Sequence, residues 1–275
     1  MDNRALISRI NRNKINDSPA LEMFDVQVIA EGKRSKKSLA VVSEEPVSLV
    51  INGRELLTML CTPENIEELA AGFLWNEGLV QSPDDILSLD VSSSKRVLIS
   101  LRNKKIDADF RNLKLSFTSG CGRGAVLHDS SNHRRIKPKE FDAVFPEAIF
   151  HDRMLELLQH AKLYNSAGSI HCTGLADKNN LIFAFEDIGR HNAADKVIGK
   201  IFLDRIDVSE RMMLTTGRMS SEIVGKAARA GVPILASISG PTSLAVEAAC
   251  YYNITLIGYL RGTGFRVYAH GERIT

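Results

Sequence analysis

The sequence predicts a mixed α/β protein, in which an α/β layered C-terminal domain follows a smaller α+β domain. From residue 166 onward, short apolar runs typical of strands alternate with segments of helical spacing. Before residue 112, strand-like runs form two hairpin signals around one helix signal. The 275 residues, 44% hydrophobic and 25% charged, suffice for one large or two ordinary soluble domains. We expect a poorly ordered tail over 1–20, the α+β domain over 21–112, a mobile loop and linker over 113–140 and the α/β domain over 141–275.

Turn and capping residues predict where the strands and the helix of the N-terminal region begin and end. Alternating apolar residues predict a strand over 24–30, and the polar stretch 31–37 predicts a turn or loop. Asn52-Gly53 separates two apolar runs and favours a tight hairpin turn, because both residues tolerate positive φ. Thr62 suits the N-cap of a helix, Pro63 its first position and Gly78 its end. The strand-like runs here are 47–51, 55–60, 86–91 and 96–101.

The C-terminal region is predicted from its alternation of element types. We expect strands over 170–174, 181–185, 211–215, 233–238 and 255–260, with a short edge strand over 265–268. Helices are expected over 147–162 and 193–202 and up to residues 230 and 251. The continuous apolar run 181–185 is typical of a buried strand. Strands that alternate with helices predict a mainly parallel sheet.

Composition excludes several classes of protein. A net charge of +2 gives no general argument for nucleic acid or a membrane surface as a partner. The start of the chain has no apolar core of a signal peptide, so we expect a cytoplasmic protein. The widely spaced Cys61, Cys121, Cys172 and Cys250 indicate free thiols rather than a disulfide framework. Because no Cys-x-x-Cys pair is present, we expect no zinc.

Cys121 is the candidate reactive residue. It lies among Gly120, Gly122 and Gly124, and glycines allow a mobile, open loop. Arg123 adds a positive charge that favours the thiolate, which is the nucleophilic form. The alternative is a flexible turn with an idle cysteine, since free cysteines are more often buried than reactive.

Polar, glycine-containing turns follow the predicted strands of the C-terminal domain. The carboxyl ends of parallel strands meet at one edge of a sheet, where ligands bind and helix N-termini favour anions. A further turn, Leu260 to Phe265, adds Arg261 and two glycines. Together these turns predict a site for a phosphate or pyrophosphate, although ordinary helix capping is the alternative for each hydroxyl. The candidate side chains are Arg190, Arg218, Ser220, Ser221, Thr242 and Ser243.

His171 and His191 are further candidates. A histidine on a strand is more often structural than catalytic. A zinc deaminase would need His-x-Glu and Pro-Cys-x-x-Cys, and neither is present. Asp187 and Asp195 are interpreted as structural or capping groups.

Several motifs together resemble the FdhD/NarQ family. They are Thr118-Ser119-Gly120-Cys121-Gly122, His171-x-Thr-Gly174, Glu186-Asp187-Ile188-Gly189-Arg190-His191-Asn192-Ala193-x-Asp195-Lys196, Thr216-Gly217-Arg218-x-Ser220-Ser221-Glu222, Gly240-Pro241-Thr242-Ser243 and Gly258-Tyr259-Leu260-Arg261-Gly262, with Cys61-Thr62-Pro63-Glu64 and Glu77-Gly78. The resemblance runs from about residue 40 to the C-terminus.

The resemblance implies a fold and a function. The fold would be a three-layer α/β/α cytidine-deaminase-like C-terminal domain without its zinc site. The protein would be a sulfurtransferase, taking a persulfide from a cysteine desulfurase onto Cys121 and sulfurating the bis(molybdopterin guanine dinucleotide) molybdenum cofactor before its insertion into formate dehydrogenase. A GDP-like nucleotide could mimic this substrate. The family implies a cytoplasmic homodimer whose partners are the desulfurase and the formate dehydrogenase catalytic subunit.

The resemblance also implies a cofactor-binding stretch at the final turn. Its residues are Tyr259, Leu260, Arg261, Gly262, Thr263, Gly264 and Phe265, beside the arginines, histidines and hydroxyls given above. One departure concerns the loop, where many family members carry Cys-x-x-Cys and this chain has Gly124. Cys121 would therefore act without a resolving cysteine, and reduction would come from outside. The alternative functions are a cofactor chaperone without sulfur chemistry and a metal-dependent nucleotide deaminase.

Overall fold

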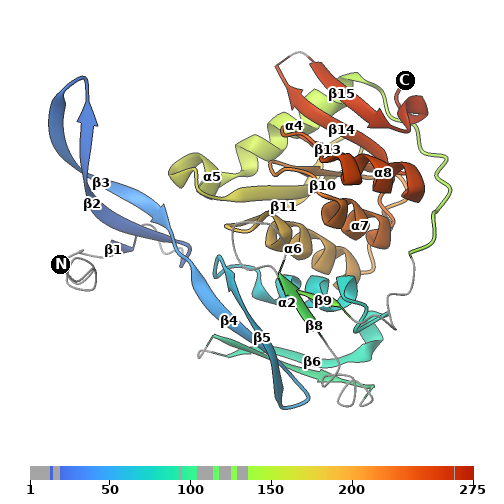
Figure 1. Cartoon of the computed structure of the whole chain (residues 1–275), viewed down its shortest axis with the longest axis horizontal. Helices are drawn as coiled ribbons and strands as arrows, with labels where there is room; N and C mark the ends of the chain where they lie inside the picture. Colours follow the sequence, from blue (N-terminus) through green and yellow to red (C-terminus); the bar gives the residue numbers. More distant parts are fainter. Residues whose placement is uncertain are drawn as a thin grey trace.

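A six-stranded sheet and a four-stranded sheet form the body of the protein, and an arm built on a three-stranded sheet projects from it (Figure 1). The computed structural model describes residues 13–14, 19–92, 95–103, 114–117, 125–128, 136–262 and 264–275. The candidate sulfur carrier Cys121 and residue Thr263 lie outside these residues. The fold is thus mixed α/β, as predicted.

The four-stranded sheet covers one side of helix α2. Its strands are β4 (Glu45–Ile51), β5 (Arg54–Cys61), β6 (Ile86–Ser92) and β7 (Arg96–Leu101), in the order β5-β4-β7-β6. The predicted hairpin turn is confirmed, since Asn52 and Gly53 have φ of 49° and 82°. The inward side chains of the sheet and of α2 (Ile66–Asn76) share one apolar core. Gly78 ends this helix with φ of 74°, as predicted.

The arm is a long hairpin of β2 (Leu21–Ala30) and β3 (Lys33–Val42), and the short β1 (Asn13–Lys14) pairs with β2. The prediction of a turn or loop over 31–37 is wrong in part, because the turn comprises only Glu31 and Gly32, which have positive φ, and the polar residues after it belong to β3. Of the predicted tail 1–20, the structure describes β1 and the fully buried Ala20, and most of the tail lies outside the described residues.

The six-stranded sheet is mixed rather than mainly parallel, so that prediction is wrong. Its order is β11-β10-β12-β13-β14-β15, and the two pairs β12–β13 and β13–β14 are parallel. β10 and β15 run antiparallel to their neighbours because hairpins join β10 to β11 and β14 to β15. The strands are β10 (His171–Ala176), β11 (Leu181–Asp187), β12 (Met212–Thr215), β13 (Ile234–Ser237), β14 (Thr255–Arg261) and β15 (Gly264–Ala269).

Helices cover both faces of this sheet. Along β12, Met213 faces the core formed by α6, α7 and α8, while Met212 and Leu214 face the core formed by α4. The helices are α4 (Ala148–His160), α5 (Lys162–Ala167), α6 (Arg190–Leu203), α7 (Ser221–Ala230) and α8 (Ser243–Tyr252). β11 is an edge strand, and its Ile182 is 36% exposed. The prediction of a buried strand is therefore wrong, although Phe183 and Phe185 pack toward α6 on one face and Leu181 and Ala184 toward α4 on the other.

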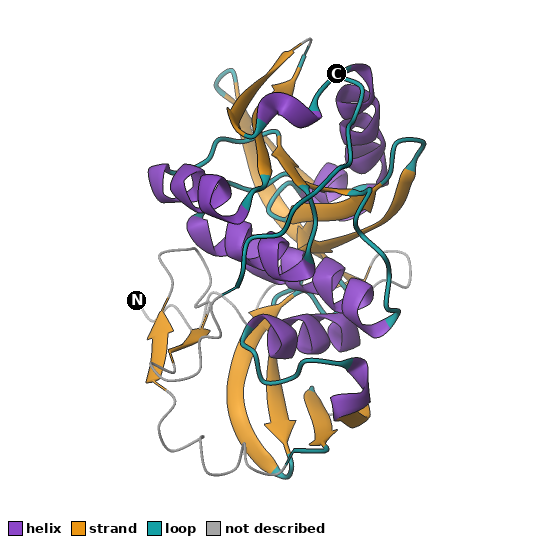
Figure 2. Ribbon diagram, turned by 90° about the vertical axis from the view of Figure 1, so that its right-hand side faces the viewer, coloured by secondary structure: helices purple, strands orange, loops and turns teal. Residues whose placement is uncertain are grey.

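Helices α2 and α6 lie side by side between the two sheets (Figure 2). A Cβ atom at Gly72 would lie 1.9 Å from the Asp195 carbonyl oxygen, and one at Gly199 would lie 1.8 Å from that of Glu68. The glycines thus let the two backbones touch. Trp75 of α2 also stacks on Phe202 of α6, with ring centroids 4.9 Å apart.

The predicted start of α2 is wrong. The helix begins at Ile66 after Asn65, which has φ of 54°. Thr62 does not cap it, because its hydroxyl accepts a hydrogen bond from the Ile188 N–H at 3.1 Å. The N-terminal part is therefore bonded to the turn that opens α6.

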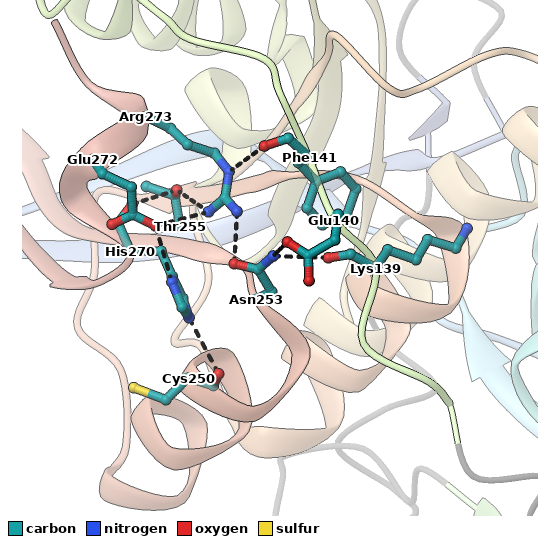
Figure 3. A network of polar contacts seen from close by, with 9 residues as sticks. All are labelled: Lys139, Glu140, Phe141, Cys250, Asn253, Thr255, His270, Glu272 and Arg273. Carbon is teal, nitrogen blue, oxygen red and sulfur yellow. Dashed lines mark hydrogen bonds and ion pairs between the residues drawn. The ribbon is translucent and has the colours of Figure 1, made fainter.

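The linker and the C-terminus hold each other. The Arg273 guanidinium donates to the Asn253 amide oxygen at 2.6 Å and to the Phe141 carbonyl (Figure 3). Asn253 in turn donates to the Lys139 carbonyl at 2.8 Å (Figure 3). Phe145 pairs with Ile274 as a parallel bridge. The segment after residue 135 thus runs along the outside of the sheet and is fixed there.

Within the described ranges, no helix has the length and apolar character needed to cross a membrane.

Candidate functional site

One edge of the six-stranded sheet brings most of the predicted site residues together. The parallel strands β12, β13 and β14 end at this edge, and their antiparallel neighbour β10 begins there at His171. His171 pairs with Asp187, the last residue of β11. The turns that open α6, α7 and α8 therefore converge, as predicted from the order of elements.

Hydroxyl groups hold the turn between β12 and α7. The Thr215 hydroxyl accepts from the Gly217 N–H at 3.2 Å, and the Ser237 hydroxyl donates to the Gly217 carbonyl at 2.7 Å. The Thr216 hydroxyl accepts from the Cys172 N–H at 3.0 Å. Because these groups are buried, the turn is fixed from below by the sheet.

Gly217 lets two candidate side chains approach this turn. A Cβ atom at Gly217 would lie 2.9 Å from the Arg190 Cβ and 3.6 Å from His171 Nδ1. The positive charges of Arg190 and Arg218 face His171. Burial, and then these two charges, hold the pKa of His171 below its ordinary value. His171 is therefore held in its neutral form beside two cations.

His191 is the more strongly shifted histidine. Burial, and then the charges of Lys226 and Arg190, lower its pKa to about 3. Its Nε2 lies 3.4 Å from Glu222 Oε2, yet that nitrogen is buried without a hydrogen bond to any described residue. We therefore read the contact as one between a carboxylate and a neutral imidazole.

Ser220 is a candidate for contact with a ligand. It is the N-cap residue of α7, but its hydroxyl makes no capping bond. The Ser220 Oγ is buried and has no hydrogen-bond partner among the described residues. The capping alternative therefore fails here. We call His171, Arg190, His191, Arg218 and Ser220 the polar-edge cluster.

The turn that opens α8 differs. The Thr242 hydroxyl accepts from the Ala245 N–H at 3.3 Å and caps the helix, which is the capping alternative. Ser243 follows it as the first helical residue, and both are exposed. Ser221 takes the equivalent first position of α7 and is half-buried.

The final turn joins β14 to β15 as a hairpin, with Gly262 at φ of 63°. The Leu260 side chain is fully buried in the core under α4, and Phe265 stacks on Phe150. Arg261 is exposed, so it can reach a ligand, as can the backbone of Gly262 and Gly264. Leu260 and Phe265 instead anchor the hairpin.

Tyr259 links the last two turns. Its ring lies where a side chain at Gly240 would stand, with the hydroxyl oxygen 2.5 Å from the Cβ position. The guanidinium of Arg266 lies over this ring, 4.5 Å from its centre, and that of Arg261 lies 5.5 Å away. Arg266 was not predicted, and a basic residue two positions along an edge strand gives no signal in sequence.

Asp187 and Asp195 are structural, as interpreted from the sequence. Asp187 forms a fully buried ion pair with Lys196 at 2.8 Å. The Asp195 carboxylate pairs with Lys226 and accepts from the Asn76 amide at 2.6 Å. Burial raises the pKa of Asp195. These groups tie α6 to α7 and to α2.

The described cysteines differ sharply in environment. Cys61 and Cys172 are fully buried. Burial raises the pKa of Cys61 to about 12 and also raises that of Cys172. Cys250 is exposed. Neither buried thiol can supply a thiolate at neutral pH.

Among the residues described, no three His, Cys, Asp or Glu side chains are grouped closely enough to hold a metal ion.

Comparison with known proteins identifies the family. The model of the FdhD/NarQ family matches residues 42–275. The chain belongs to the FdhD/NarQ family. This confirms the resemblance seen in the motifs.

FdhD/NarQ relatives match the chain over nearly its whole length. The sulfur carrier protein FdhD of Bacillus subtilis (strain 168) is 35% identical over 252 residues, which are 91% of this chain and 96% of the relative. That of Staphylococcus aureus (strain MRSA252) is 34% identical over 245 residues, 89% of this chain and 92% of the relative. A crystal structure assigned as a formate dehydrogenase accessory protein from Desulfotalea psychrophila has a TM-score of 0.77 and 27% identity, and the match covers 94% of this chain and all of that one.

Proposed function

We propose that this chain is a sulfur carrier that serves formate dehydrogenase. It accepts a persulfide sulfur from a cysteine desulfurase on Cys121 and delivers it to the bis(molybdopterin guanine dinucleotide) molybdenum cofactor. The observation that carries the proposal is the match to the FdhD sulfur carrier proteins over 91% of this chain. The polar-edge cluster adds a place for the substrate.

Acceptance of sulfur is a thiol exchange. The Cys121 thiolate attacks the outer sulfur of the desulfurase persulfide, the S–S bond of that persulfide breaks, and the desulfurase thiolate leaves. Delivery of that sulfur to the metal as sulfide needs two electrons. Since position 124 is glycine, we assign these electrons to an external dithiol reductant. The cofactor is substrate in this scheme.

The assignment of Cys121 rests on elimination as well as on its loop. Cys61 and Cys172 are buried and held as thiols by their raised pKa. Cys250 is the exposed alternative near the C-terminal end of α8, where its backbone carbonyl contacts His270 (Figure 3). Cys250 therefore supplies a matched control.

The pyrophosphate of the guanine dinucleotide suits the polar-edge cluster. Arg190 and Arg218 offer positive charge, and Ser220 offers a buried hydroxyl at the N-terminus of α7. Helix N-termini favour phosphates because their N–H groups and dipoles point at the ligand. Neutral imidazoles at His171 and His191 can donate one hydrogen bond each without adding charge.

Further parts of the proposal follow from the resemblance. Helices on both faces of the six-stranded sheet support a three-layer α/β/α arrangement like that of cytidine deaminases. We also propose a cytoplasmic homodimer, with the division into domains at residues 112 and 140.

A sulfur-loading assay tests the proposal. The protein is incubated with a cysteine desulfurase and cysteine, and its mass is then measured under non-reducing conditions. We expect one added sulfur on the wild type and on Cys250→Ala, and none on Cys121→Ala. Formate dehydrogenase activity in cells should be lost with Cys121→Ala alone.

Other outcomes would overturn the sulfur chemistry. Sulfur on Cys121→Ala would place the carrier elsewhere in the chain. Full formate dehydrogenase activity with Cys121→Ala, together with GDP-dependent thermal stabilisation, would leave a cofactor chaperone. Stoichiometric zinc in the purified protein would favour the deaminase alternative.

A further inference from the structure

Thr62 directly follows β5 of the four-stranded sheet. Its N–H, hydroxyl and carbonyl groups nevertheless each bond to the segment that carries Arg190 and His191. Its N–H donates to Asp187 Oδ2 at 3.1 Å. Its hydroxyl accepts from the Ile188 N–H at 3.1 Å, and its carbonyl accepts from Lys196 Nζ at 3.2 Å. Thr62 is fully buried, so water cannot replace these bonds.

Asp187 is the centre of this contact. Besides Thr62 and Lys196, its carboxylate accepts from the Gly189 N–H at 2.8 Å and from the Asn192 side chain at 3.0 Å. Asn192 also donates to the Leu60 carbonyl at 2.9 Å. The turn between β11 and α6 is thus bonded to Leu60 near the end of β5 and to Thr62 just after it.

An apolar contact would join these parts more simply. Burial of a charged pair costs desolvation, which its own attraction and hydrogen bonds only partly offset. The Asp187–Lys196 pair is fully buried and lies within a set of directional bonds. Directional bonds fix backbone geometry more narrowly than apolar packing does, which suggests a role in placing the turn.

Placement matters because the next residues belong to the polar-edge cluster. Arg190 and His191 follow Gly189 directly and open α6. The Arg190 Cβ packs against Gly217, in contact too close for any added side chain. A small shift of Ile188 would therefore move both side chains relative to Arg218 and Ser220.

We infer that Thr62 is a positioning residue for the polar-edge cluster, acting through the Ile188 N–H on Arg190 and His191. This inference rests on the proposed function for the ligand class, a guanine nucleotide. The segment after β5 would thus help to form a site whose own side chains lie on β10, on α6 and in the turn before α7.

Three variants test the inference, with GDP as the probe and calorimetry at a temperature where each variant is folded. Thr62→Val keeps the shape of the side chain but removes the hydroxyl, so Ile188 loses its acceptor. We expect GDP affinity to fall about tenfold, or about 1.4 kcal/mol of binding free energy, because Arg190 and His191 are no longer held in place for the ligand. Thr62→Ser keeps the hydroxyl and should bind GDP within about twofold of the wild type. Val97→Ala, in the core of the four-stranded sheet, should lower stability without changing GDP affinity.

Two readouts separate positioning from general support. In an Arg190→Ala/His191→Asn background, Thr62→Val should change GDP affinity by less than about twofold, because its effect acts through these two side chains. Amide hydrogen exchange at Ile188 and Gly189 should speed up in Thr62→Val and not in Thr62→Ser.

Each contrary result has a distinct meaning. The inference is overturned if Thr62→Val binds GDP as tightly as the wild type does. It is also overturned if Thr62→Ser or Val97→Ala loses as much GDP affinity as Thr62→Val. If the wild type binds GDP but takes up no sulfur on Cys121, the proposed sulfur-carrier function is wrong and the inference on Thr62 stands. A wild type that binds neither GDP nor pyrophosphate removes the nucleotide part of the proposed function and the inference together.

Discussion

The turns that open α7 and α8 have almost the same backbone and opposite uses of their hydroxyl groups. The N-cap residues Ser220 and Thr242 have φ/ψ of −90°/167° and −86°/164°. Thr242 is exposed and caps its helix, whereas the Ser220 hydroxyl is buried and makes no bond to a described residue. An unsatisfied buried hydroxyl costs about 1–3 kcal/mol, which supports the proposal that a ligand bonds to Ser220.

The surroundings of the two turns explain this difference. The α7 turn lies against Arg190 and His171, which come from α6 and β10. The α8 turn lies against the ring of Tyr259, and its first helical residues face solvent. The two turns thus differ in the charged side chains that neighbouring elements bring to them and not in their own backbone, and this difference supports the proposal of a ligand at the α7 turn.

The largest expected effect tests how closely the α7 turn is enclosed. The pKa of His191 is about 3 in the folded protein against an ordinary value of 6.5. As the pH falls below 6.5, the unfolded state takes up a proton that the folded state refuses, so stability falls until the pH nears 3. At about pH 4.5, the free energy of unfolding of the wild type should therefore be roughly 3 kcal/mol lower than at neutral pH because of this histidine. Urea unfolding of wild type and His191→Asn at both pH values measures the difference.

His191→Asn should lose less stability on acidification by that amount. Thr242→Ala, with the same change of pH, serves as the control and should follow the wild type. Parallel pH profiles for wild type and His191→Asn would mean that water reaches the imidazole and that the α7 turn is as open as the α8 turn.

The next effect separates the two hydroxyls directly. Thr242→Ala removes a helix cap and should lower the free energy of unfolding by about 1 kcal/mol. Ser220→Ala removes no cap and should leave stability unchanged or raised by up to about 1 kcal/mol. GDP affinity should behave in the opposite way, falling about tenfold in Ser220→Ala and staying constant in Thr242→Ala. Urea unfolding and calorimetry on the same preparations give both quantities.

Each variant is the control for the other. Thr242→Ala should lower stability but not GDP affinity, and Ser220→Ala should lower GDP affinity but not stability. The comparison breaks if Ser220→Ala destabilises α7 as much as Thr242→Ala destabilises α8, because Ser220 would then be an ordinary cap. It also breaks if both variants bind GDP equally.

Sequence predicts the polar edge well because order along the chain fixes it. Helix α6 joins β11 to β12, and these strands run in the same direction, so Arg190 and Arg218, which follow them, lie at one edge. The antiparallel direction of β10 was missed, yet His171 still reaches that edge because it begins the strand rather than ends it. Asn52-Gly53 predicts its hairpin because the signal is local.

Contacts between distant segments are what the sequence conceals. Thr62 and Pro63 have the right residue types for a helix start, but the hydroxyl of Thr62 is bound to Ile188, far along the chain. The polar strand β3 lacks an apolar alternation because both of its faces are largely exposed. Ser220 and Thr242 look alike in sequence, and only tertiary packing decides which of them caps its helix.

The smallest effect concerns the α8 side of the comparison. Arg266 lies over the Tyr259 ring at 4.5 Å, and an exposed contact of this kind is worth about 0.5–1 kcal/mol. Arg266→Ala should lower the urea midpoint accordingly, while Arg266→Lys should retain part of the contact. Arg34→Ala, an exposed arginine on the arm, controls for the loss of charge. GDP affinity should be the same in all three, since the Tyr259 ring packs on Gly240 rather than on a residue of the polar-edge cluster. A fall of more than about threefold in Arg266→Ala alone, worth about 0.7 kcal/mol, would bring Tyr259 into the nucleotide site and make the two turns parts of one surface.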